Sequence, residues 1–475
     1  MVFSSLTFIF IFLPAVLVVY ALIHPKLKNA LLFAASILFY AYGTWRYTWL
    51  LLGEIAVNWY LGLRMDALGK DRKRERALLL ALAVCVDLGI LVYFKYAGFI
   101  LRNLTLLTGH RFPKIRAALP IGISFYTFQA ISYVADVYRG KRAQKNPVNL
   151  GLYLAFFPQL IAGPIVRYQE IEKQLVSRRS SFDMIADGAC TFCIGLCMKV
   201  LLADQLAVLA DFAFQADRIA DRPCIVLWLG ALAYALQIYF DFAGYSKMAI
   251  GLGSMFGFKL PVNFNAPYLA ATGTDFWRRW HISLSAWFRD YVYIPLGGNR
   301  RGDAVTIRNL AVVWLLTGIW HGAGWTFILW GVLWGALLIL ERFVIRPDTR
   351  GRAFRVLYRC FTILWAVLLW MLFRSESLGA AAAYLKGLFP GLGAGITSHE
   401  AAGYAWYFRD TLLYLVIGAA AAVRLPQRWM NRVPERTMLR VVAENIGMVL
   451  LVVMTLLCVS RLAGGAYNPF LYFNF

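Results

Sequence analysis

Apolar runs long enough to cross a lipid bilayer constrain this chain more than any other feature. A membrane-spanning helix needs about 20 mainly apolar residues, and such runs recur from residues 6–23 to residues 441–459. Only 15% of the residues are charged, whereas soluble domains carry about a quarter. The sequence therefore excludes a soluble protein and predicts an all-α polytopic membrane protein, with one membrane domain over residues 1–475.

We expect about eleven crossings, because each needs roughly 20 residues. The candidate segments are 6–23, 30–43, 46–63, 77–101, 118–138, 148–166, 186–214, 224–257, 309–343, 356–373, 409–423 and 441–459. As one helix, residues 309–343 would extend to about 50 Å, so a broken helix or a tight helix pair is expected there. Basic loops flank residues 77–101 on both sides, so this segment crosses, dips back or is kinked near Lys95.

The excess of basic over acidic residues also fits a membrane protein. Lys and Arg number 48 and Asp and Glu 25, a formal net charge of +23, and the basic residues lie between the apolar runs. Such residues orient membrane spans and contact anionic lipid, so membrane lipid is the expected partner and nucleic acid is not. The first basic residues, Lys26 and Lys28, follow the first apolar run, which predicts that the N-terminus lies outside and residues 24–29 in the cytosol.

Three of the seven cysteines, Cys190, Cys193 and Cys197, repeat at helical spacing. Small residues on one stripe of a membrane helix are typical of helix contacts, and no histidine lies nearby to complete a metal site. We therefore expect packing residues and no bound metal.

Helix-breaking residues interrupt the apolar stretch FFPQLIAGPIVRY at residues 156–168. Pro158, Gly163 and Pro164 cannot continue an ideal helix. Non-helical backbone at membrane depth is tolerated only where protein buries it or a cavity wets it. The pattern predicts a re-entrant element beside an internal cavity.

His321 is the only ionisable residue between Ala311 and Leu340, within a stretch that also has five tryptophans and five glycines. An ionisable group inside a membrane segment indicates a functional site. Burial disfavours the imidazolium form, so the ring should be neutral and able to accept a proton, as a general base must. A core histidine bonded to a backbone carbonyl is the structural alternative.

His281 lies in DFWRRWHISLSAWFRDYVYIPLGGNRR, residues 275–301, with five arginines and two aspartates. On one continuous helix, the bulky apolar side chains would share a face, namely Trp277, Trp280, Leu284, Phe288 and Tyr291, beside a polar stripe of Arg278, Ser285 and Arg289. His281 would lie on the border. We expect this helix along the membrane interface, with its arginines bound to lipid phosphates or to a phosphorylated ligand.

Two pairs of charges stand inside or beside apolar segments. Asp241 and Lys247 lie within QIYFDFAGYSKMAIGLG, and we expect them to pair with each other in the bundle interior. Asp136 and Arg139, near the end of another segment, are expected to pair at the membrane interface.

Five blocks in this order resemble the membrane-bound O-acyltransferase family, and its bacterial alginate O-acetyltransferase branch in particular. The blocks are PIGISFYTFQAISYVADVYRG (120–140), FFPQLIAGPIVRY, QIYFDFAGYSKMAIGLG, FWRRWHISLSAWFRDYVYIPLGGNR and LLTGIWHGAGWTFILWG, with the opening MVFSS and the closing NPFLYFNF also similar. The resemblance implies about eleven helices with re-entrant and interfacial helices around a central tunnel. It implies a multi-pass protein of the bacterial inner membrane. It also implies that His321 is the catalytic membrane histidine and His281 the second active-site position.

The resemblance further implies an O-acetyltransferase that uses cytosolic acetyl-CoA as donor substrate, with no permanently bound cofactor. The acceptor would be an extracytoplasmic polysaccharide such as alginate, reached directly or through a periplasmic partner protein. His321 would act as general base or form an acyl-imidazole, and His281 would orient the thioester or stabilise the oxyanion. Arg289, Arg300 and Arg301 are candidates for the coenzyme A phosphates. A transporter or flippase for a lipid-linked glycan and a scaffold for polymer export are the alternatives.

Overall fold

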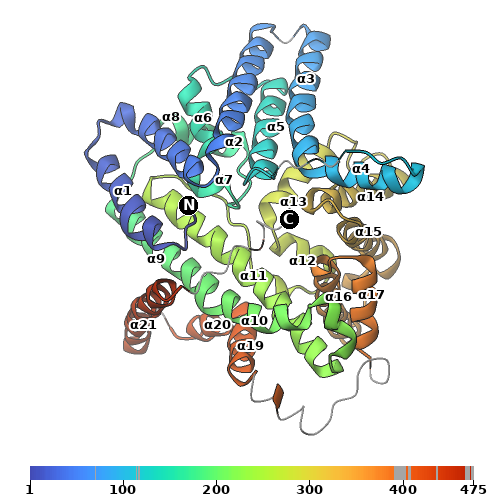
Figure 1. Ribbon diagram of the computed structural model, residues 1–475. Coiled ribbons are helices and arrows are strands. Elements are labelled where there is room, and N and C mark those ends of the chain that lie inside the picture. The colour runs from blue at the N-terminus through green and yellow to red at the C-terminus, as the bar shows by residue number, and fades with distance from the viewer. Residues whose placement is uncertain are drawn as a thin grey trace. The chain divides into compact units, whose positions relative to one another are not determined.

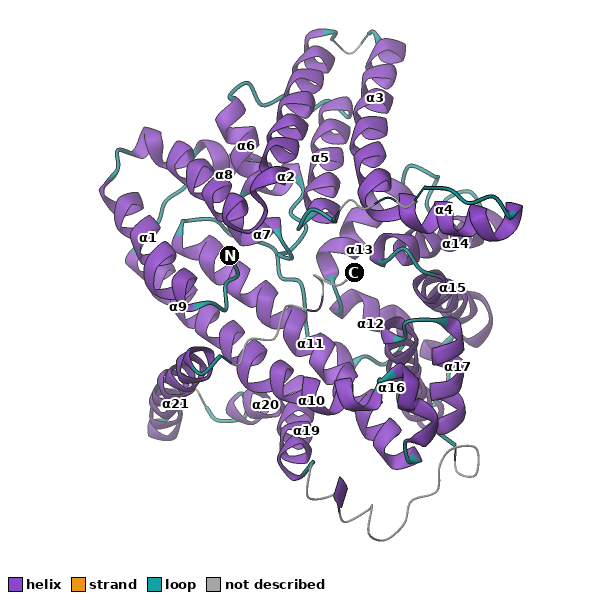
Figure 2. Ribbon diagram, viewed as in Figure 1, coloured by secondary structure: helices purple, strands orange, loops and turns teal. Residues whose placement is uncertain are grey.

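Helices make up every regular element of the residues that the computed structural model describes, which are 1–69, 71–113, 115, 118–389, 403–404, 408–434, 437–465 and 471 (Figure 2). Seven helical segments in this part of the chain are long and apolar enough to cross a membrane, namely 73–108, 182–213, 224–255, 303–321, 325–349, 352–374 and 438–463. The all-α membrane fold is therefore confirmed, while the expected count of eleven crossings is not. Of the closing NPFLYFNF, only Leu471 lies among the described residues.

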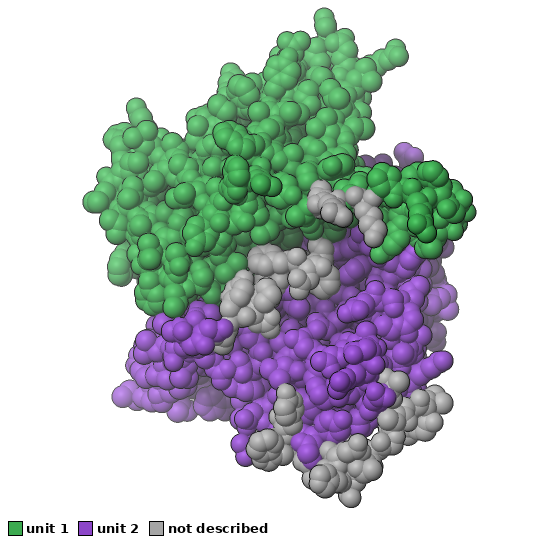
Figure 3. Space-filling view, viewed as in Figure 1, with its two compact units in different colours: residues 1–192, 245–262, 286–292 green, residues 193–244, 263–285, 293–475 purple. Residues whose placement is uncertain are grey.

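The chain forms two compact units (Figure 3). Unit 1 comprises residues 1–192, 245–262 and 286–292, and unit 2 comprises residues 193–244, 263–285 and 293–475. The prediction of one domain over residues 1–475 stays a prediction, because one membrane domain can contain two compact units.

Unit 1 is built on the helices of the N-terminal part of the chain (Figure 1). These are α1 (Leu13–Leu22), α2 (Lys28–Ala67), α3 (Lys73–Leu91), α4 (Ala97–Thr108), α5 (Ile123–Tyr138), α6 (Pro147–Ala155), α7 (Phe157–Leu160), α8 (Tyr168–Val176) and most of α9 (Phe182–Cys197). Helices α2, α3 and α5 pack against one another, and the side chains of α5 are almost all buried. The apolar segment 77–101 is interrupted by a π-helical turn at Val92–Tyr96, which favours the kink near Lys95 among the three alternatives.

The helix breakers at residues 156–168 act as predicted. α6 ends at Ala155, the short α7 ends at Leu160, and no further helix begins until Tyr168. Gly163 and Pro164 lie in this non-helical stretch, Pro158 lies in the first turn of α7, and all three are buried. Protein therefore covers the non-helical backbone, as its position in an apolar segment requires. The internal cavity beside it stays a prediction.

Unit 2 is built on the later helices. They are α10 (Asp204–Ala213), the first part of α11 (Cys224–Met255), α12 (Gly273–Arg279), the start of α13 (Ile282–Phe288), α14 (Asp303–His321), α15 (Trp325–Leu340), α16 (Arg352–Arg374), α17 (Leu378–Gly387), α19 (Arg409–Ala422), α20 (Leu425–Met430) and α21 (Met438–Ala463). α14 and α15 form the tight pair expected for residues 309–343 (Figure 1). Gly318 and Gly331 face each other between them, where a Cβ on either would overlap backbone of the other helix.

The expectation of one interfacial helix over residues 275–301 is wrong. α12 ends at Arg279 and α13 begins at Ile282, with the break at Trp280 and His281. Trp277, Trp280 and Leu284 are buried, so protein rather than lipid surrounds them. Trp280 stacks on Phe276 and packs against Trp370 of α16, with ring centroids 5.7 and 4.6 Å away. Aromatic contacts within unit 2 therefore take up the apolar face that the helical projection assigned to the membrane.

Candidate active site

His321 is the last residue of α14, at the corner between α14 and α15. Helix α14 stops here because Gly322 and Gly324 adopt extended backbone angles. Gly322 is required by space as well, because a Cβ there would overlap the ring of Phe327. The sequence thus ends one membrane helix on a histidine and begins the next four residues later, which fixes the ring at the corner.

Aromatic rings surround His321, which is only 2% exposed. Its ring meets Trp320, Trp330 of α15 and Phe373 of α16 edge to face, with centroids 4.9, 4.9 and 5.3 Å away. These rings shield the imidazole from water. The role of His321 as a proton acceptor stays a prediction.

His281 occupies the break between α12 and α13. Its backbone is left-handed, with φ of 44°, a conformation that is uncommon outside glycine and costs energy when a larger side chain adopts it. The side chain is completely buried, and burial lowers the pKa of His281 to about 3. The ring is therefore neutral at physiological pH.

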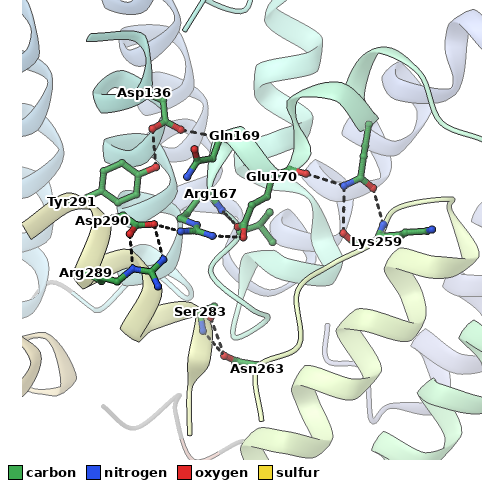
Figure 4. Close-up of polar contacts among 12 residues, drawn as sticks. Asp136, Arg167, Gln169, Glu170, Lys259, Asn263, Ser283, Arg289, Asp290 and Tyr291 are labelled. Atoms are coloured by element: carbon green, nitrogen blue, oxygen red, sulfur yellow. Dashed lines mark hydrogen bonds and ion pairs between the residues drawn. The ribbon is translucent and has the colours of Figure 1, made fainter. Parts of the chain in front are cut away.

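Asn263, which the sequence analysis did not single out, holds the His281 ring. Its Oδ1 lies 3.1 Å from Nδ1 of His281 and also accepts hydrogen bonds from the Ser283 backbone N–H and hydroxyl, at 3.3 and 2.9 Å. Figure 4 shows the contact between Asn263 and Ser283. An amide oxygen only accepts, so Nδ1 of His281 carries the proton and Nε2 of the neutral ring is an acceptor. In the sequence, the one signal that could have singled out Asn263 is its position as an asparagine in a mainly apolar run.

The structure brings the two histidines to a common neighbour. Trp320 contacts His321 with ring centroids 4.9 Å apart and His281 with centroids 6.0 Å apart, both edge to face. Phe242 of α11 closes another side of His281 at 4.6 Å. Two histidines 40 positions apart in the sequence therefore belong to one buried aromatic cluster in unit 2.

Glu341, at the end of α15, anchors the segment that carries His281. Its carboxylate accepts the backbone N–H groups of Gly273 and Thr274 at 2.5 and 2.8 Å, and the hydroxyls of Thr274 and Tyr358 at 2.7 and 2.9 Å. These N–H groups belong to the first turn of α12, where a negative charge is favoured. The carboxylate thereby ties the start of α12 to the helix that follows His321.

The expected pair of Asp241 and Lys247 is wrong. Asp241 instead contacts Lys199 at 2.9 Å, and Lys199 also contacts Asp204 at 2.7 Å. Asp241 further accepts the backbone N–H of Leu471 at 2.8 Å. Side chains six positions apart on a continuous helix point to different faces, because the helix repeats every 3.6 residues. The tertiary partner therefore replaces the sequence neighbour.

The three candidate arginines fall in different units. Arg300 and Arg301 are exposed and lie in unit 2, on a turn in which Gly297 and Gly298 have positive φ. Asn309 of α14 supports this turn by donating to the carbonyls of Leu296 and Gly298 at 3.3 and 2.9 Å. The turn is therefore a built feature that presents two cations to its surroundings.

Arg289 belongs to unit 1 and is paired there (Figure 4). It donates to Asp290 at 2.7 and 3.2 Å, while Arg167 contacts the same Asp290 and also Glu170. Burial alone would raise the pKa of Asp290, but the hydrogen bonds and charges of Arg289 and Arg167 lower it overall. Part of the charge of Arg289 is therefore already compensated.

The expected pair of Asp136 and Arg139 is also wrong. Asp136 accepts hydrogen bonds from the Tyr291 hydroxyl at 2.9 Å and the Gln169 backbone at 3.3 Å, while Arg139 donates to the backbone of Asp290 at 2.6 Å. Arg139 lies at the C-terminal end of α5, where its guanidinium reaches a carbonyl instead of the neighbouring carboxylate.

The cysteines behave as packing residues within the described ranges. Cys190, Cys193 and Cys197 lie on α9, and the sulfur of Cys197 is 3.8 Å from that of Cys458 on α21. In the part of the chain that the structure describes, no group of three or more His, Cys, Asp or Glu residues is arranged to hold a metal ion.

Comparison with known proteins identifies the family of this chain. The family model of the membrane-bound O-acyltransferase family matches residues 123–375. The chain is 41% identical to a probable alginate O-acetylase of Pseudomonas putida over the full length of both proteins. It is 46% identical to a probable alginate O-acetylase of Pseudomonas aeruginosa, covering 82% of this chain and 75% of the relative. It is 38% identical to a peptidoglycan O-acetyltransferase of Helicobacter pylori, covering 82% and 80%.

The fold defines a helical, multi-pass membrane protein. The family model and the full-length relative show that the chain belongs to the membrane-bound O-acyltransferase family. It is an acyltransferase. The alternatives of a transporter and of a scaffold lose their support, because the family and the relatives are acyltransferases.

Proposed function

We propose that this protein moves an acetyl group from cytosolic acetyl-CoA to an extracytoplasmic polysaccharide, alginate or a similar exopolysaccharide, at the bacterial inner membrane. The relatives named alginate O-acetylase and peptidoglycan O-acetyltransferase support transfer of an acetyl group to a polysaccharide. The polymer accepts the acetyl group directly or through a periplasmic partner protein. Acetyl-CoA serves as a donor substrate, and no permanently bound cofactor is required.

The observation that carries this proposal is the shared contact of His321 and His281 with Trp320 in a buried aromatic cluster. An acetyl thioester is already activated, so the enzyme must align a hydroxyl with it and remove the hydroxyl proton. His321 takes that proton as the oxygen attacks the carbonyl carbon, the carbon–sulfur bond breaks, and the thiolate leaves and receives the proton. If His321 instead attacks first, an acyl-imidazole forms as the carbon–sulfur bond breaks and the thiolate leaves. The hydroxyl oxygen then attacks the acyl carbon, the bond to the imidazole breaks, and the hydroxyl proton passes to the thiolate.

His281 orients the reacting groups in this proposal. The possible roles of His281 narrow because Asn263 fixes the Nδ1–H tautomer, so Nε2 accepts hydrogen bonds rather than donating them. A developing oxyanion needs hydrogen-bond donors. Nε2 is a hydrogen-bond acceptor, which suits the hydroxyl group of the polysaccharide that receives the acetyl group. The geometry thus supports positioning over oxyanion stabilisation for His281.

Arg300 and Arg301 are the stronger candidates for the coenzyme A phosphates, because both are exposed on a turn that Asn309 supports. Arginine suits phosphate because its planar guanidinium donates several parallel hydrogen bonds. Arg289 is a weaker candidate, since Asp290 already accepts its hydrogen bonds.

The test is transfer of labelled acetyl from acetyl-CoA by the purified protein in lipid, with release of free coenzyme A as a second measurement. We expect His321→Ala to lower the rate about 10²–10⁴-fold, the range for loss of a general base. His110→Ala, at an exposed histidine, is the matched control and should retain activity. Wild-type activity of His321→Ala would refute the mechanism, and absence of transfer from acetyl-CoA by the wild type would refute the donor.

A further inference from the structure

Two buried carboxylates in unit 1, Glu54 and Asp87, play no part in the proposed mechanism. Glu54 is 3% exposed and Asp87 completely buried. They lie on α2 and α3, two of the three neighbouring helices α2, α3 and α5 (Figure 1). An ionisable side chain inside such a helix group is costly to bury, so its retention indicates a function.

Asn58 and Thr127 bring the two carboxylates into one cluster. Asn58, one turn after Glu54, donates from Nδ2 to the Glu54 backbone carbonyl at 3.0 Å and to Oδ1 of Asp87 at 2.8 Å. Thr127 of α5 donates to Oε1 of Glu54 at 3.5 Å. The charge of Asp87 acts directly on Glu54. Three helices therefore converge on the pair.

The cluster contains more acceptors than donors. Each carboxylate receives a hydrogen bond at one oxygen, whereas Oε2 of Glu54, Oδ2 of Asp87 and Oδ1 of the fully buried Asn58 have no hydrogen-bond partner among the described residues. The other ionisable groups that face the pair are the phenols of Tyr40 on α2 and Tyr126 on α5. Neither carboxylate takes part in the ion pairs found in the described ranges.

We propose that Glu54 and Asp87 form a proton-binding site, in which one of the two carboxyl groups holds a proton. Two buried like charges repel each other, and protonation of one carboxylate removes that repulsion. A metal cation fits less well, because the described residues offer no third His, Cys, Asp or Glu ligand beside the pair.

Loss of this proton places two negative charges between α2 and α3. The unfolded chain exposes both carboxyls to water, which screens the repulsion between them. Stability is therefore expected to fall as the pH rises through the range in which the folded pair releases its proton, and to level off above it. The pair thus makes the packing of α2, α3 and α5 sensitive to alkaline pH.

Infrared spectroscopy of the full-length protein in lipid tests the site directly. We expect a carbonyl band of a protonated carboxyl group at neutral pH, which the double variant Glu54→Gln, Asp87→Asn lacks. Each single variant should shift or remove the same band, so the result does not depend on folding of the double variant. Glu75→Gln, at an exposed residue on α3 that pairs with Arg72, is the matched control and should keep it. An identical band in wild type and all three pair variants, or no band in the wild type, overturns the proposal.

Thermal unfolding in buffers of increasing pH gives the second measurement. The wild type and Glu75→Gln should lose thermal stability at alkaline pH, whereas the double variant should lose less. Equal pH dependence in the wild type and the double variant overturns the proposal. So does a stability of the wild type that rises with added sodium or calcium ions and no longer depends on pH, because that result assigns a metal cation to the pair.

Discussion

Polar groups are held in two different ways in the ion-pair network of unit 1 and in the histidine cluster of unit 2. In unit 1, Arg167, Glu170, Asp290 and Arg289 neutralise one another through direct ion pairs (Figure 4). In unit 2, His321 and His281 are surrounded by aromatic rings and carry no charge in our interpretation. The difference teaches that paired charges tie segments together, whereas a neutral imidazole in an aromatic cluster keeps its capacity to exchange a proton.

The largest expected effect comes from Lys199, a paired charge in the same unit as the histidines. Lys199→Met leaves Asp204 and Asp241 buried without their cation, and we expect the free energy of unfolding to fall by about 3–5 kcal/mol. Unfolding in detergent measures it. Adding Asp241→Asn to this variant should restore part of the loss. If Lys199→Met instead keeps its full stability but loses acetyl transfer, Lys199 takes part in the reaction, and the contrast between paired charges and neutral histidines fails.

Substitution of His281 should lower activity, whereas substitution of Lys199 should lower stability. We expect His281→Ala to lower kcat/KM about 10²-fold, the cost of misplaced reacting groups, with a smaller loss for Asn263→Ala because the ring remains present but no longer fixed. Steady-state kinetics on purified variants measure both, and the loss should fall on kcat more than on KM. If Asn263→Ala loses activity and stability to the same extent, this asparagine has only a structural role.

Asp290 tests the ion-pair network of unit 1. Asp290→Asn removes the charge between Arg167 and Arg289, and we expect a loss of about 1.5–3 kcal/mol, the range for hydrogen bonds to charged groups. Because the pKa of Asp290 is lowered in the folded protein, its contribution is present above the usual carboxyl pKa and is lost as the pH falls through the lowered pKa.

Thermal unfolding at decreasing pH follows this contribution. The wild type should lose more stability in acid than Asp290→Asn, so the two curves should converge at low pH. Parallel curves would show that the network does not stabilise unit 1.

The smallest effect is expected for the exposed arginines. Arg300→Ala and Arg301→Ala should each raise KM for acetyl-CoA about fivefold, because exposed ion pairs are individually weak, and should leave kcat nearly unchanged. Arg409→Ala, at another exposed arginine, is the control. An unchanged KM in both variants would remove the phosphate assignment from this turn.

Local patterns carried many of the predictions that the structure confirms. The length of the apolar run 309–343 predicted the break between α14 and α15, and Gly163 and Pro164 marked the non-helical stretch, because backbone restrictions act within a few residues. Predictions of which groups contact each other failed where the true contact lies far away in the sequence. Asp241 pairs with Lys199 rather than Lys247, and the aromatic face of residues 277–288 packs on protein rather than lipid.

The sequence by itself determined the membrane class and the helical fold, because hydropathy and helix breakers are properties of short segments, and it singled out His321 and His281 as candidates. Only the tertiary structure decided that Trp320 contacts both histidines, that Asn263 fixes the His281 tautomer and that Asn58 of α2 binds Asp87 of α3. Such contacts join distant segments of the chain, and the approach of two segments depends on packing over their whole length, which no local pattern encodes.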